Sequence, residues 1–492
     1  MLALAPSIVA AAQLVQPPTT PAPTPAPTPA PSWSDGIGAL IHARCTECHR
    51  PDGGSPFALL THRDAARKAR TMLEVVEDRI MPPWPAAHGG ELYREARRLS
   101  DGEIALIKAW VEAGAPEGDP ARAPAPPTFA AEWLLGTPDR EIAMAEPFTV
   151  PASGKDIYKY FTIPIGVDGD RWLSAIDIRS NAPAVVHHVL FFVESPEAKA
   201  AKRPRAERRR SIGGWAVGMR GQRLPLGLGH PIPAGSDLVL QVHFHPSGKR
   251  EDVTVRVGLW FTDEKPAREL LEFQLPAAFG QHAGLDIPAG DAAWTLRDRW
   301  RVPAPIEIVS VWAHAHTVCS SARAVAHLPD GTSRPLLSIP HWKFDWQLRY
   351  DFVEPVLLPA GTIVESELVY DNSAANPWNP FQPPQRIRWG EETTDEMGSL
   401  IFNAVAVDPR DRGTLGAAYH AHVEATAHGV AGRGAERHID ASKAFDRDGD
   451  GILTQEEMPE RWRNELLGFD DNRDGRVSFE ELTEGLNGRS KR

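Results

Sequence analysis

Cysteine is scarce in this sequence, with three residues in a chain of 492. Two of them, Cys45 and Cys48, lie together in the pentapeptide CTECH. A disulfide framework is therefore excluded if both thiols are used within that motif. The third, Cys319, has small or apolar neighbours, which predicts a buried and unreactive thiol. Packing has to stabilise this disulfide-poor chain.

The chain also lacks an excess of basic over acidic residues. The chain has 53 Lys and Arg against 65 Asp and Glu, a net charge of -12, which argues against sequence-independent binding of nucleic acid. Long apolar runs are missing as well, since no uninterrupted stretch after the first residues reaches the length of a membrane helix. We therefore expect no nucleic-acid partner and no transmembrane domain beyond a possible N-terminal anchor.

The first residues, MLALAPSIVAAAQ, form a short apolar run that ends in small residues. This pattern is typical of a secretory signal cleaved near Ala12, and we assign residues 1–16 to it. No Lys or Arg precedes the run, so a truncated start or an uncleaved anchor are alternatives. Residues 17–32 repeat Pro, Thr and Ala and predict an extended linker. The secretory signal predicts a periplasmic, secreted or cell-surface location.

Aromatic residues, proline and glycine are plentiful, with 15 Trp, 17 Phe, 46 Pro and 40 Gly, and they favour packed cores and strand-rich architecture. Residues 33–118 nevertheless read as helical. Ser100 and Glu103 form a capping box there, and Gly114 ends the helix that follows. After a Pro-rich linker at 119–134, short apolar or alternating runs between turn signals predict two β-sandwiches. We place them at 135–275 and 276–425.

The CTECH motif predicts covalent attachment of one haem. Cys45 and Cys48 would bond the vinyl groups, and His49 would then be the first axial ligand of the iron. A zinc pair is the alternative, but the sequence has no second CxxC. For the sixth ligand we choose Met81 in the proline-flanked RIMPPWPA, with His62, Met72 and His88 as substitutes. The segment resembles small cytochromes c, which implies an all-α cytochrome c-like domain at 33–118.

Three histidine groups lie in strand-like contexts: His187 with His188, His243 with His245, and His314 with His316. Residues two apart on a strand face the same side, so the last pair can bind one metal ion. The adjacent pair can do so only if the chain bulges there or its pairing ends. Copper is favoured over zinc if a thioether joins the imidazoles, and Met397 is the candidate.

In sequence order these motifs are VVHHVLFF, LVLQVHFHPSG, VWAHAH and TTDEMGS. They resemble the copper type II, ascorbate-dependent monooxygenases, the family of peptidylglycine alpha-hydroxylating monooxygenase and dopamine beta-monooxygenase, over roughly residues 135 to 425. The resemblance implies two jelly-roll domains, each with one copper, across a solvent-filled cleft. By position, His187, His188 and His243 look like the ligands of the electron-transfer copper. The catalytic copper, which binds dioxygen, would be held by His314, His316 and Met397.

Some positions depart from that family. Peptide-amidating members carry an Arg two residues before the HxH motif to hold the substrate carboxylate, and this chain has Trp312 there. A peptide C-terminus is therefore not the expected substrate. Ser399 and Ile401 replace polar and aromatic residues after the methionine, which predicts a more apolar pocket. His245 is a spare histidine that can support a ligand from behind.

The C-terminal segment, residues 436–488, contains two loops with the ligand spacing of EF hands, which predicts up to two calcium ions. The first loop would use Asp446, Asp448, Asp450, Ile452, Thr454 and Glu457, and the second Asp470, Asn472, Asp474, Arg476, Ser478 and Glu481. Extracellular calcium is usually plentiful, so a structural role is favoured over a regulatory one.

The sequence therefore predicts a multidomain oxidoreductase: an all-α cytochrome c-like domain, two all-β jelly-roll sandwiches and a C-terminal α EF-hand pair. It would hydroxylate a C–H bond of a small organic substrate with dioxygen, and the haem would donate or relay electrons, with an external donor as a further partner. A non-catalytic haem and copper electron-transfer or copper-binding protein is one alternative, and a surface binding module is another. The basic stretch that begins at Lys199 is either a solvated insert or a docking surface for the cytochrome-like part.

Overall fold

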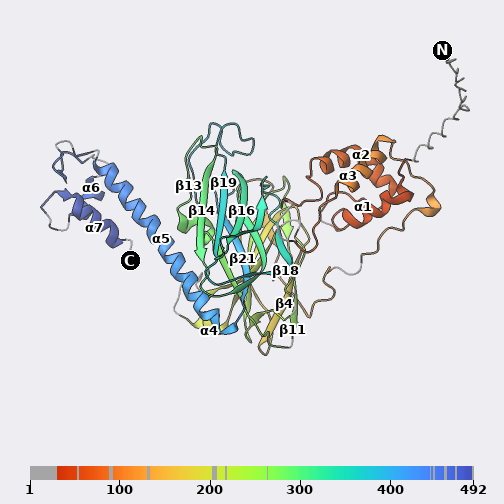
Figure 1. Cartoon of the computed structure of the whole chain (residues 1–492), viewed down its shortest axis with the longest axis horizontal. Helices are drawn as coiled ribbons and strands as arrows, with labels where there is room; N and C mark the ends of the chain where they lie inside the picture. The colour runs from red at the N-terminus through yellow and green to blue at the C-terminus, as the bar shows by residue number, and fades with distance from the viewer. Residues whose placement is uncertain are drawn as a thin grey trace, which may run out of the picture.

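The computed structural model describes residues 30–489 except for 52–54, 88–91, 130–132, 202–207, 217–218, 226, 263, 444, 447–448, 459–462, 471 and 473. The expected signal segment and most of the linker at 17–32 lie outside the described residues. Figure 1 shows a central body of β-strands with the N-terminal helices at one end and the C-terminal helices at the other.

The N-terminal segment, residues 33–123, contains η1 (Trp33–Ile37), α1 (Gly38–Arg44), α2 (His62–Glu77), α3 (Asp101–Glu112) and η2 (Pro120–Arg122). The capping box of Ser100 and Glu103 at the start of α3 is confirmed, and a second one caps α2. One apolar face of each helix contributes to a small shared core, in which Ile107 and Trp110 are almost completely buried.

The fold class expected from the sequence is wrong. Strands take up 35% of the chain and helices 21%, the strands form several small antiparallel sheets, and no all-α cytochrome domain is present in the described residues. The physical reason lies between α2 and α3. There Ala86 enters the core of the β body and Trp84 and Tyr93 pack against it, so these apolar side chains are buried by the β body and not within a separate helical domain.

The first β-unit comprises strands β1 to β11 and one short helix, α4 (Pro196–Ala200). The strands are β1 (Arg140–Ala143), β2 (Phe148–Val150), β3 (Ile157–Pro164), β4 (Arg171–Ser180), β5 (Val186–Glu194), β6 (Arg210–Ala216), β7 (Gln222–Arg223), β8 (His230–Ile232), β9 (Asp237–Phe244), β10 (Glu251–Val253) and β11 (Val255–Thr262). One sheet has the order β1-β11-β4-β7 with β8 also on β4, another has the order β3-β9-β5-β6, and β2 pairs with β10. Their inner faces share one hydrophobic core.

The second β-unit comprises strands β12 to β21 and a short helix, η4 (Ala278–Ala283). The strands are β12 (Leu270–Leu275), β13 (Asp286–Ile287), β14 (Trp294–Arg301), β15 (Ile306–Ala315), β16 (Cys319–His327), β17 (Ser333–Ile339), β18 (Arg349–Leu358), β19 (Ile363–Tyr370), β20 (Ile387–Arg388) and β21 (Gly398–Ala406). The sheets β12-β21-β15-β18 and β14-β19-β16-β17 enclose a second core, and β13 pairs with β20.

The C-terminal part begins with η5 (Pro409–Asp411) and the long helix α5 (Arg412–Lys443), which extends away from the β body (Figure 1). It continues through β22 (Ile452–Leu453), α6 (Arg463–Leu466), η6 (Leu467–Phe469), β23 (Val477–Ser478) and α7 (Phe479–Arg489). The strands β22 and β23 pair with each other and place the two predicted calcium loops side by side. None of the described helices is both long and apolar enough to cross a membrane.

Candidate metal centre

A bulge in β5 brings the first three predicted copper ligands together. Val186 pairs with Phe244 on β9 and His188 pairs with His243, so the register between the two strands skips His187. The extra residue removes the alternation that would send His187 and His188 to opposite faces of the sheet. The bulge that the sequence required for this pair to act together is therefore present.

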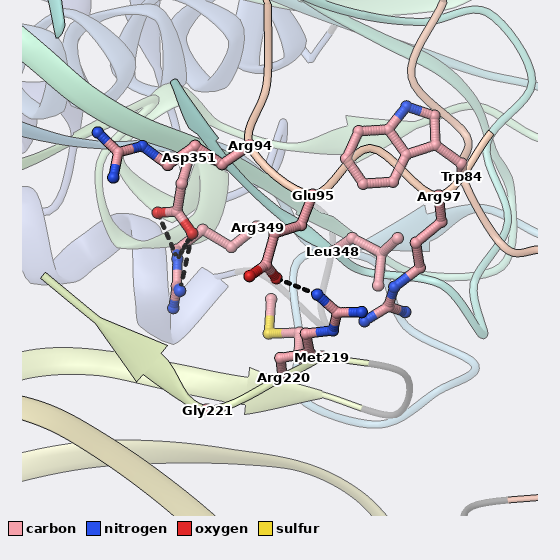
Figure 2. Close-up of a pocket in the computed structure, with 10 residues that line it drawn as sticks. All are labelled: Trp84, Arg94, Glu95, Arg97, Met219, Arg220, Gly221, Leu348, Arg349 and Asp351. Carbon is pink, nitrogen blue, oxygen red and sulfur yellow. Dashed lines mark hydrogen bonds and ion pairs between the residues drawn. The ribbon is translucent and has the colours of Figure 1, made fainter. Parts of the chain in front are cut away.

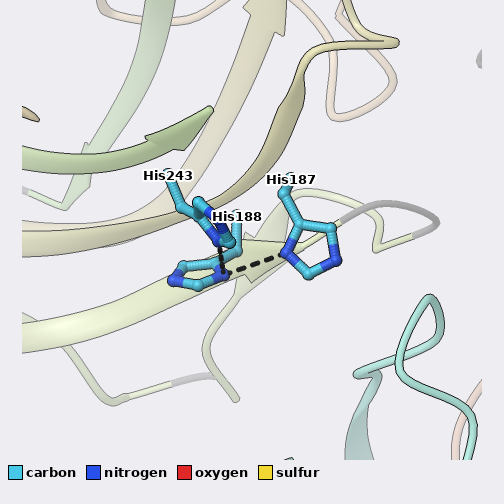
Figure 3. Close-up of side chains that lie close together, drawn as sticks. All are labelled: His187, His188 and His243. Carbon is cyan, nitrogen blue, oxygen red and sulfur yellow. Dashed lines mark hydrogen bonds between the residues drawn. The ribbon is translucent and has the colours of Figure 1, made fainter. Parts of the chain in front are cut away.

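The three imidazoles point toward one another, as Figure 3 shows. The δ-nitrogen of His188 lies 3.3 Å from those of His187 and His243, and the possible ligand atoms of the three residues all lie within 4.8 Å of one another. Two imidazole nitrogens bound to one ion at about 2.05 Å with tetrahedral geometry are about 3.3 Å apart. The spacing of this histidine trio, His187, His188 and His243, therefore fits one metal ion.

Asp156 supports the histidine trio from behind. Its carboxylate lies 3.0 Å from the ε-nitrogen of His243 and 2.7 Å from the δ-nitrogen of His245. Burial would raise the pKa of Asp156, but the hydrogen bonds from His243 and His245 hold it below its usual value. A carboxylate in this position fixes the tautomer of a metal-binding histidine. His245 is exposed and contacts the Asp156 oxygen that does not face His243.

The second predicted ligand set lies at the end of β15. His314 is paired with Ser399 and Ala315 with Gly398 of β21, and His316 and Met397 are the residues next to this last pair on the two chains. The ring centroids of His314 and His316 are 5.5 Å apart, and both rings and Met397 line the same cavity. Two imidazoles and a thioether form a donor set that suits copper better than zinc.

Two buried residues orient this second set, and sequence reasoning missed both. The side-chain oxygen of Gln347 lies 2.6 Å from the δ-nitrogen of His314. The carboxyl of Glu396 accepts hydrogen bonds from the backbone N–H groups of His316, Met397 and Val318. Burial raises the pKa of Glu396 to about 8 despite these bonds. Glu396 thereby ties the end of β15 to the segment that carries Met397.

The two ligand sets adjoin each other. The ring centroids of His188 and His314 are 5.6 Å apart, and Phe344 of the second β-unit stacks on His187 at 4.5 Å. Phe344 also lies 6.1 Å from the ring of His316. The solvent-filled cleft implied by the family resemblance therefore does not separate the two sets in this structure, because His188 and His314 are in direct ring contact.

A cavity of about 290 Å³ opens beside these residues, and we call it the metal cavity. Besides His188, His314, His316 and Met397, its lining is mainly aromatic and aliphatic, with a few polar groups: Tyr158, Tyr160, Leu190, Phe192, Trp215, Ala216, Gln241, Ala278, Phe279, Trp312, Gln347, Trp389 and Glu391. Trp312 does line it, as expected for a substrate-facing position. Ser399 and Ile401 do not belong to this lining. The size suits a small organic molecule.

Four histidines of the two sets, His187, His188, His314 and His316, are held in the neutral form that binds metals. Burial, together with the neighbouring His243, lowers the pKa of His187 to about 3, and burial lowers the pKa of His316 to about 4. The pKa values of His188 and His314 also lie well below the usual range, mainly through burial. Metal binding at neutral pH therefore does not have to displace protons from these four rings.

The CTECH motif follows α1 as a helical turn. The N–H of His49 bonds to the carbonyl of Cys45 at 3.0 Å, and neither Cys45 nor Cys48 is in a disulfide. The δ-nitrogen of His49 contacts Ser55 at 2.7 Å and the carbonyl of Phe57 at 3.3 Å, so the ε-nitrogen is the one that suits iron. Two thiols and an oriented imidazole on one turn fit covalent haem attachment.

The sixth haem ligand stays a prediction. Met81 follows α2 with a half-buried side chain, and its N–H bonds to the carbonyl of Val75. Of the substitutes, Met72 packs in the core of the N-terminal segment, and His62 bonds to the carbonyl of Ala115 at 2.9 Å. His88 lies outside the described residues. The substitutes that can be described are thus already engaged, Met72 in packing and His62 in a hydrogen bond, which favours Met81.

Both predicted calcium loops have the glycine conformation that an EF hand requires at its sixth position. Gly451 and Gly475, at the sixth position of each loop, have φ values of +80° and +81°, which favour glycine. Their N–H groups bond to the first loop residues, Asp446 at 3.0 Å and Asp470 at 2.9 Å. The other predicted ligands follow at the expected loop positions, except that Asp448 lies outside the described residues.

Comparison with known proteins supports the C-terminal part alone. The EF-hand family model matches residues 469–486, so this part of the chain contains an EF hand, which supports calcium binding there. A search of curated proteins gives no match.

Among solved structures, the chain is similar to the major capsid protein P2 from bacteriophage PM2, with 9% identity, 55% of this chain and 98% of that chain covered, and a TM-score of 0.26. It is also similar to PNGase F from Flavobacterium meningosepticum, with 10% identity, 55% and 97% covered, and a TM-score of 0.27. Similarities this weak carry no argument about function.

Proposed function

We propose that this protein is a copper-dependent monooxygenase that hydroxylates a C–H bond of a small organic substrate with dioxygen. One observation carries the proposal: the bulge at His187 assembles three imidazoles at metal-ligand spacing, directly beside a second set with a different donor chemistry. Two different copper environments suit a division between electron transfer and oxygen binding. A storage protein does not need that division, so we favour the enzyme.

The family resemblance supports the assignment of roles. His187, His188 and His243 would hold the electron-transfer copper, and His314, His316 and Met397 would hold the copper that binds dioxygen. When bound, these ions supply one-electron transfer and oxygen activation. The protein contributes the orientation of the ligands through Asp156 and Gln347.

The cavity wall contributes the substrate site. Trp312, Trp215 and Phe279 line the metal cavity next to the histidines and exclude water from them. Such a wall favours an apolar or aromatic substrate small enough for about 290 Å³. Trp312 stands where the peptide-amidating enzymes hold a carboxylate, so it selects against a peptide C-terminus.

A haem c on Cys45, Cys48 and His49 is the second part of the proposal, with Met81 as the opposite ligand. A thioether opposite an imidazole raises the potential of haem iron relative to two imidazoles, which suits electron transfer. Covalent haem attachment in bacteria takes place outside the cytoplasm, so we place the protein in the periplasm or at the cell surface. Up to two calcium ions would complete the cofactors.

The proposal is tested by counting metals in the full-length protein after maturation in a periplasm with haem attachment. We expect about one iron and two copper ions per chain, with one copper lost in His243→Ala and the other in His314→Ala. His327→Ala is the matched control, because this histidine lies on β16 and contacts Ser333 outside the metal cavity. Paramagnetic resonance of the two single variants should show two different copper spectra.

The decisive follow-up is oxygen uptake with a reductant and a panel of small aromatic and aliphatic substrates. Uptake linked to a hydroxylated product in the wild type, and to none in Met397→Ala, would support the enzyme. Two bound copper ions without any product from the panel would favour the electron-transfer alternative. Iron without copper would overturn the proposal and favour a binding module.

A further inference from the structure

Arg220 links the haem motif to the β body. Its guanidinium forms ion pairs with Glu47, the residue between Thr46 and Cys48 in CTECH, and with Glu95 from the chain between α2 and α3. Figure 2 shows Arg220 facing the carboxylate of Glu95. Burial would lower the pKa of Arg220, but the two carboxylates raise it above its usual value, and Arg220 in turn lowers the pKa of Glu47 against the effect of burial.

The pocket around Arg220 lies where the N-terminal segment meets both β-units. This junction cavity, of about 60 Å³, is lined by Trp84 and Glu95 of the N-terminal segment, Met219 and Arg220 of the first β-unit, and Leu348 and Arg349 at the start of β18 (Figure 2). The turn that carries Cys48 is therefore attached at the seam between the two β-units.

Two short stretches of chain lead from the junction cavity to the metal cavity. In the first, the Met219 carbonyl accepts a hydrogen bond from the indole of Trp215 at 3.2 Å, and Ala216 is paired with His188. Trp215 and Ala216 both line the metal cavity.

In the second stretch, Arg349 and Leu348 line the junction cavity, and the adjacent Gln347 contacts His314. Each ligand set is thus reached from the haem motif through a few residues.

We infer that Arg220 is the positioning residue of an electron-entry junction. It holds the CTECH turn against the seam, so that an electron from a haem on Cys45 and Cys48 enters the metal cavity through Met219 and Trp215 or along residues 347–349. The inference rests on the proposed function and adds the place where the two redox parts meet. In the step itself ferrous haem iron becomes ferric, one cupric ion becomes cuprous, and no atom is transferred.

The exposure of this ion pair indicates that Arg220 positions the turn more than it stabilises the fold. The side chains of Arg220 and Glu47 are 34% and 28% exposed, and ion pairs at such sites contribute modestly to stability. The N-terminal segment is attached independently, since Tyr93 packs on Tyr350 and Phe352 and donates a hydrogen bond to the Leu336 carbonyl at 2.7 Å. Removing Arg220 should therefore loosen the turn without detaching the segment.

The test compares the wild type with Arg220→Gln, Arg220→Lys and the charge swap Glu47→Arg with Arg220→Glu. Arg44→Gln is the matched control, because Arg44 precedes Cys45 directly but pairs at 2.9 Å with Glu103 inside the N-terminal segment. Haem and copper are counted first in every sample. The haem is then photoreduced under argon in the protein with cupric copper, and its reoxidation is followed by absorbance while copper reduction is followed by paramagnetic resonance.

We expect Arg220→Gln to slow this internal electron transfer about tenfold, which corresponds to about 1.4 kcal/mol and matches the loss of a charge-assisted hydrogen bond. Arg220→Lys and the charge swap should recover part of the rate, and Arg44→Gln should keep it. Hydrogen exchange of residues 45–50 should rise most in Arg220→Gln, less in Arg220→Lys and the charge swap, and not in Arg44→Gln.

Two results would overturn the inference. One is an unchanged rate in Arg220→Gln with full copper. The other is unchanged exchange in the CTECH turn. A wild type with haem but no copper would overturn the proposed function itself, and with it the electron route, whereas the exchange measurement would still report whether Arg220 holds the turn.

Discussion

Gln347 determines which nitrogen of His314 faces the metal cavity. Its side-chain oxygen lies 2.6 Å from the δ-nitrogen, so the ε-nitrogen is left for a metal ion. Removing such a partner typically weakens metal binding by about 10- to 100-fold. We expect Gln347→Ala to weaken copper binding at the second ligand set by this amount and to leave the histidine trio unaffected. Titration of the reduced protein with a competing cuprous chelator measures both sites.

Gln222→Ala is the control for this prediction, because it also truncates a buried glutamine, on β7 of the first β-unit. Its copper affinities should equal those of the wild type. If Gln347→Ala also binds both copper ions with wild-type affinity, Gln347 has no part in orienting His314.

Single residues were predictable where the chemistry is local to the sequence. The CTECH motif places two thiols and an imidazole on one turn, and His314 and His316 share a face because strands alternate with period two. Asp156 and Gln347 could not be predicted, because they approach His243 and His314 from other segments of the chain. The sequence alone does not show which histidine a polar residue from a distant segment will contact.

At the level of elements, the helix caps were the most predictable features. The Ser100 hydroxyl accepts a hydrogen bond from the N–H of Glu103, and the Glu103 carboxylate accepts one from the N–H of Ser100. Replacing such a cap by alanine costs about 1 kcal/mol. We expect Ser100→Ala to destabilise α3 by this amount and to raise hydrogen exchange in residues 101–112, as measured by mass spectrometry.

Ser247→Ala provides the comparison for Ser100→Ala, because Ser247 lies in an exposed loop between β9 and β10 and contacts only the side chain of Glu251. Hydrogen exchange in α3 should be the same in Ser247→Ala as in the wild type. Equal exchange of α3 in Ser100→Ala and the wild type would show that tertiary packing of Ile107 and Trp110 alone determines the stability of this helix.

Strand pairing was less predictable than the helices. The sequence indicated that a bulge was needed at His187 and His188, but only the pairing with β9 shows that the register skips His187. Helices are present within residues 33–118 as expected, but the described residues do not form the expected all-α domain, for a related reason. Trp84 and Tyr93 look like core residues of a small helical domain, yet their partners are Tyr350 and Phe352, which lie more than 250 residues further along the chain.

At the scale of the whole molecule, α5 connects the EF hand to the second β-unit. The hydroxyl of Tyr419 donates to the carbonyl of Gln274 and accepts from its N–H, both at 2.9 Å, and His422 lies 3.0 Å from the buried Asp298. The first turns of α5 are therefore anchored to the β body by contacts that contain no calcium ligand.

We therefore expect calcium removal to loosen the C-terminal part only as far as this anchor. Calcium at about 100 times its dissociation constant stabilises the folded loops by about 2.7 kcal/mol, and this contribution is lost on chelation. Hydrogen exchange should rise in residues 445–489 and stay unchanged in 412–426, and haem and copper contents should not change. Glu481→Gln, which alters the last ligand of the matched EF hand, should show the same pattern in the presence of calcium.

A different pattern would assign calcium a regulatory role. The helix η4 contacts α5 and carries Phe279, whose ring lies 5.0 Å from that of His314 at the metal cavity. If chelation also raises exchange in residues 278–283 or changes the copper spectrum, the anchor at Tyr419 and His422 transmits the state of the EF hand to the cavity. Because Tyr419 is tied to the backbone of β12, which directly precedes η4, Tyr419→Phe should then abolish that transmission while calcium binding persists.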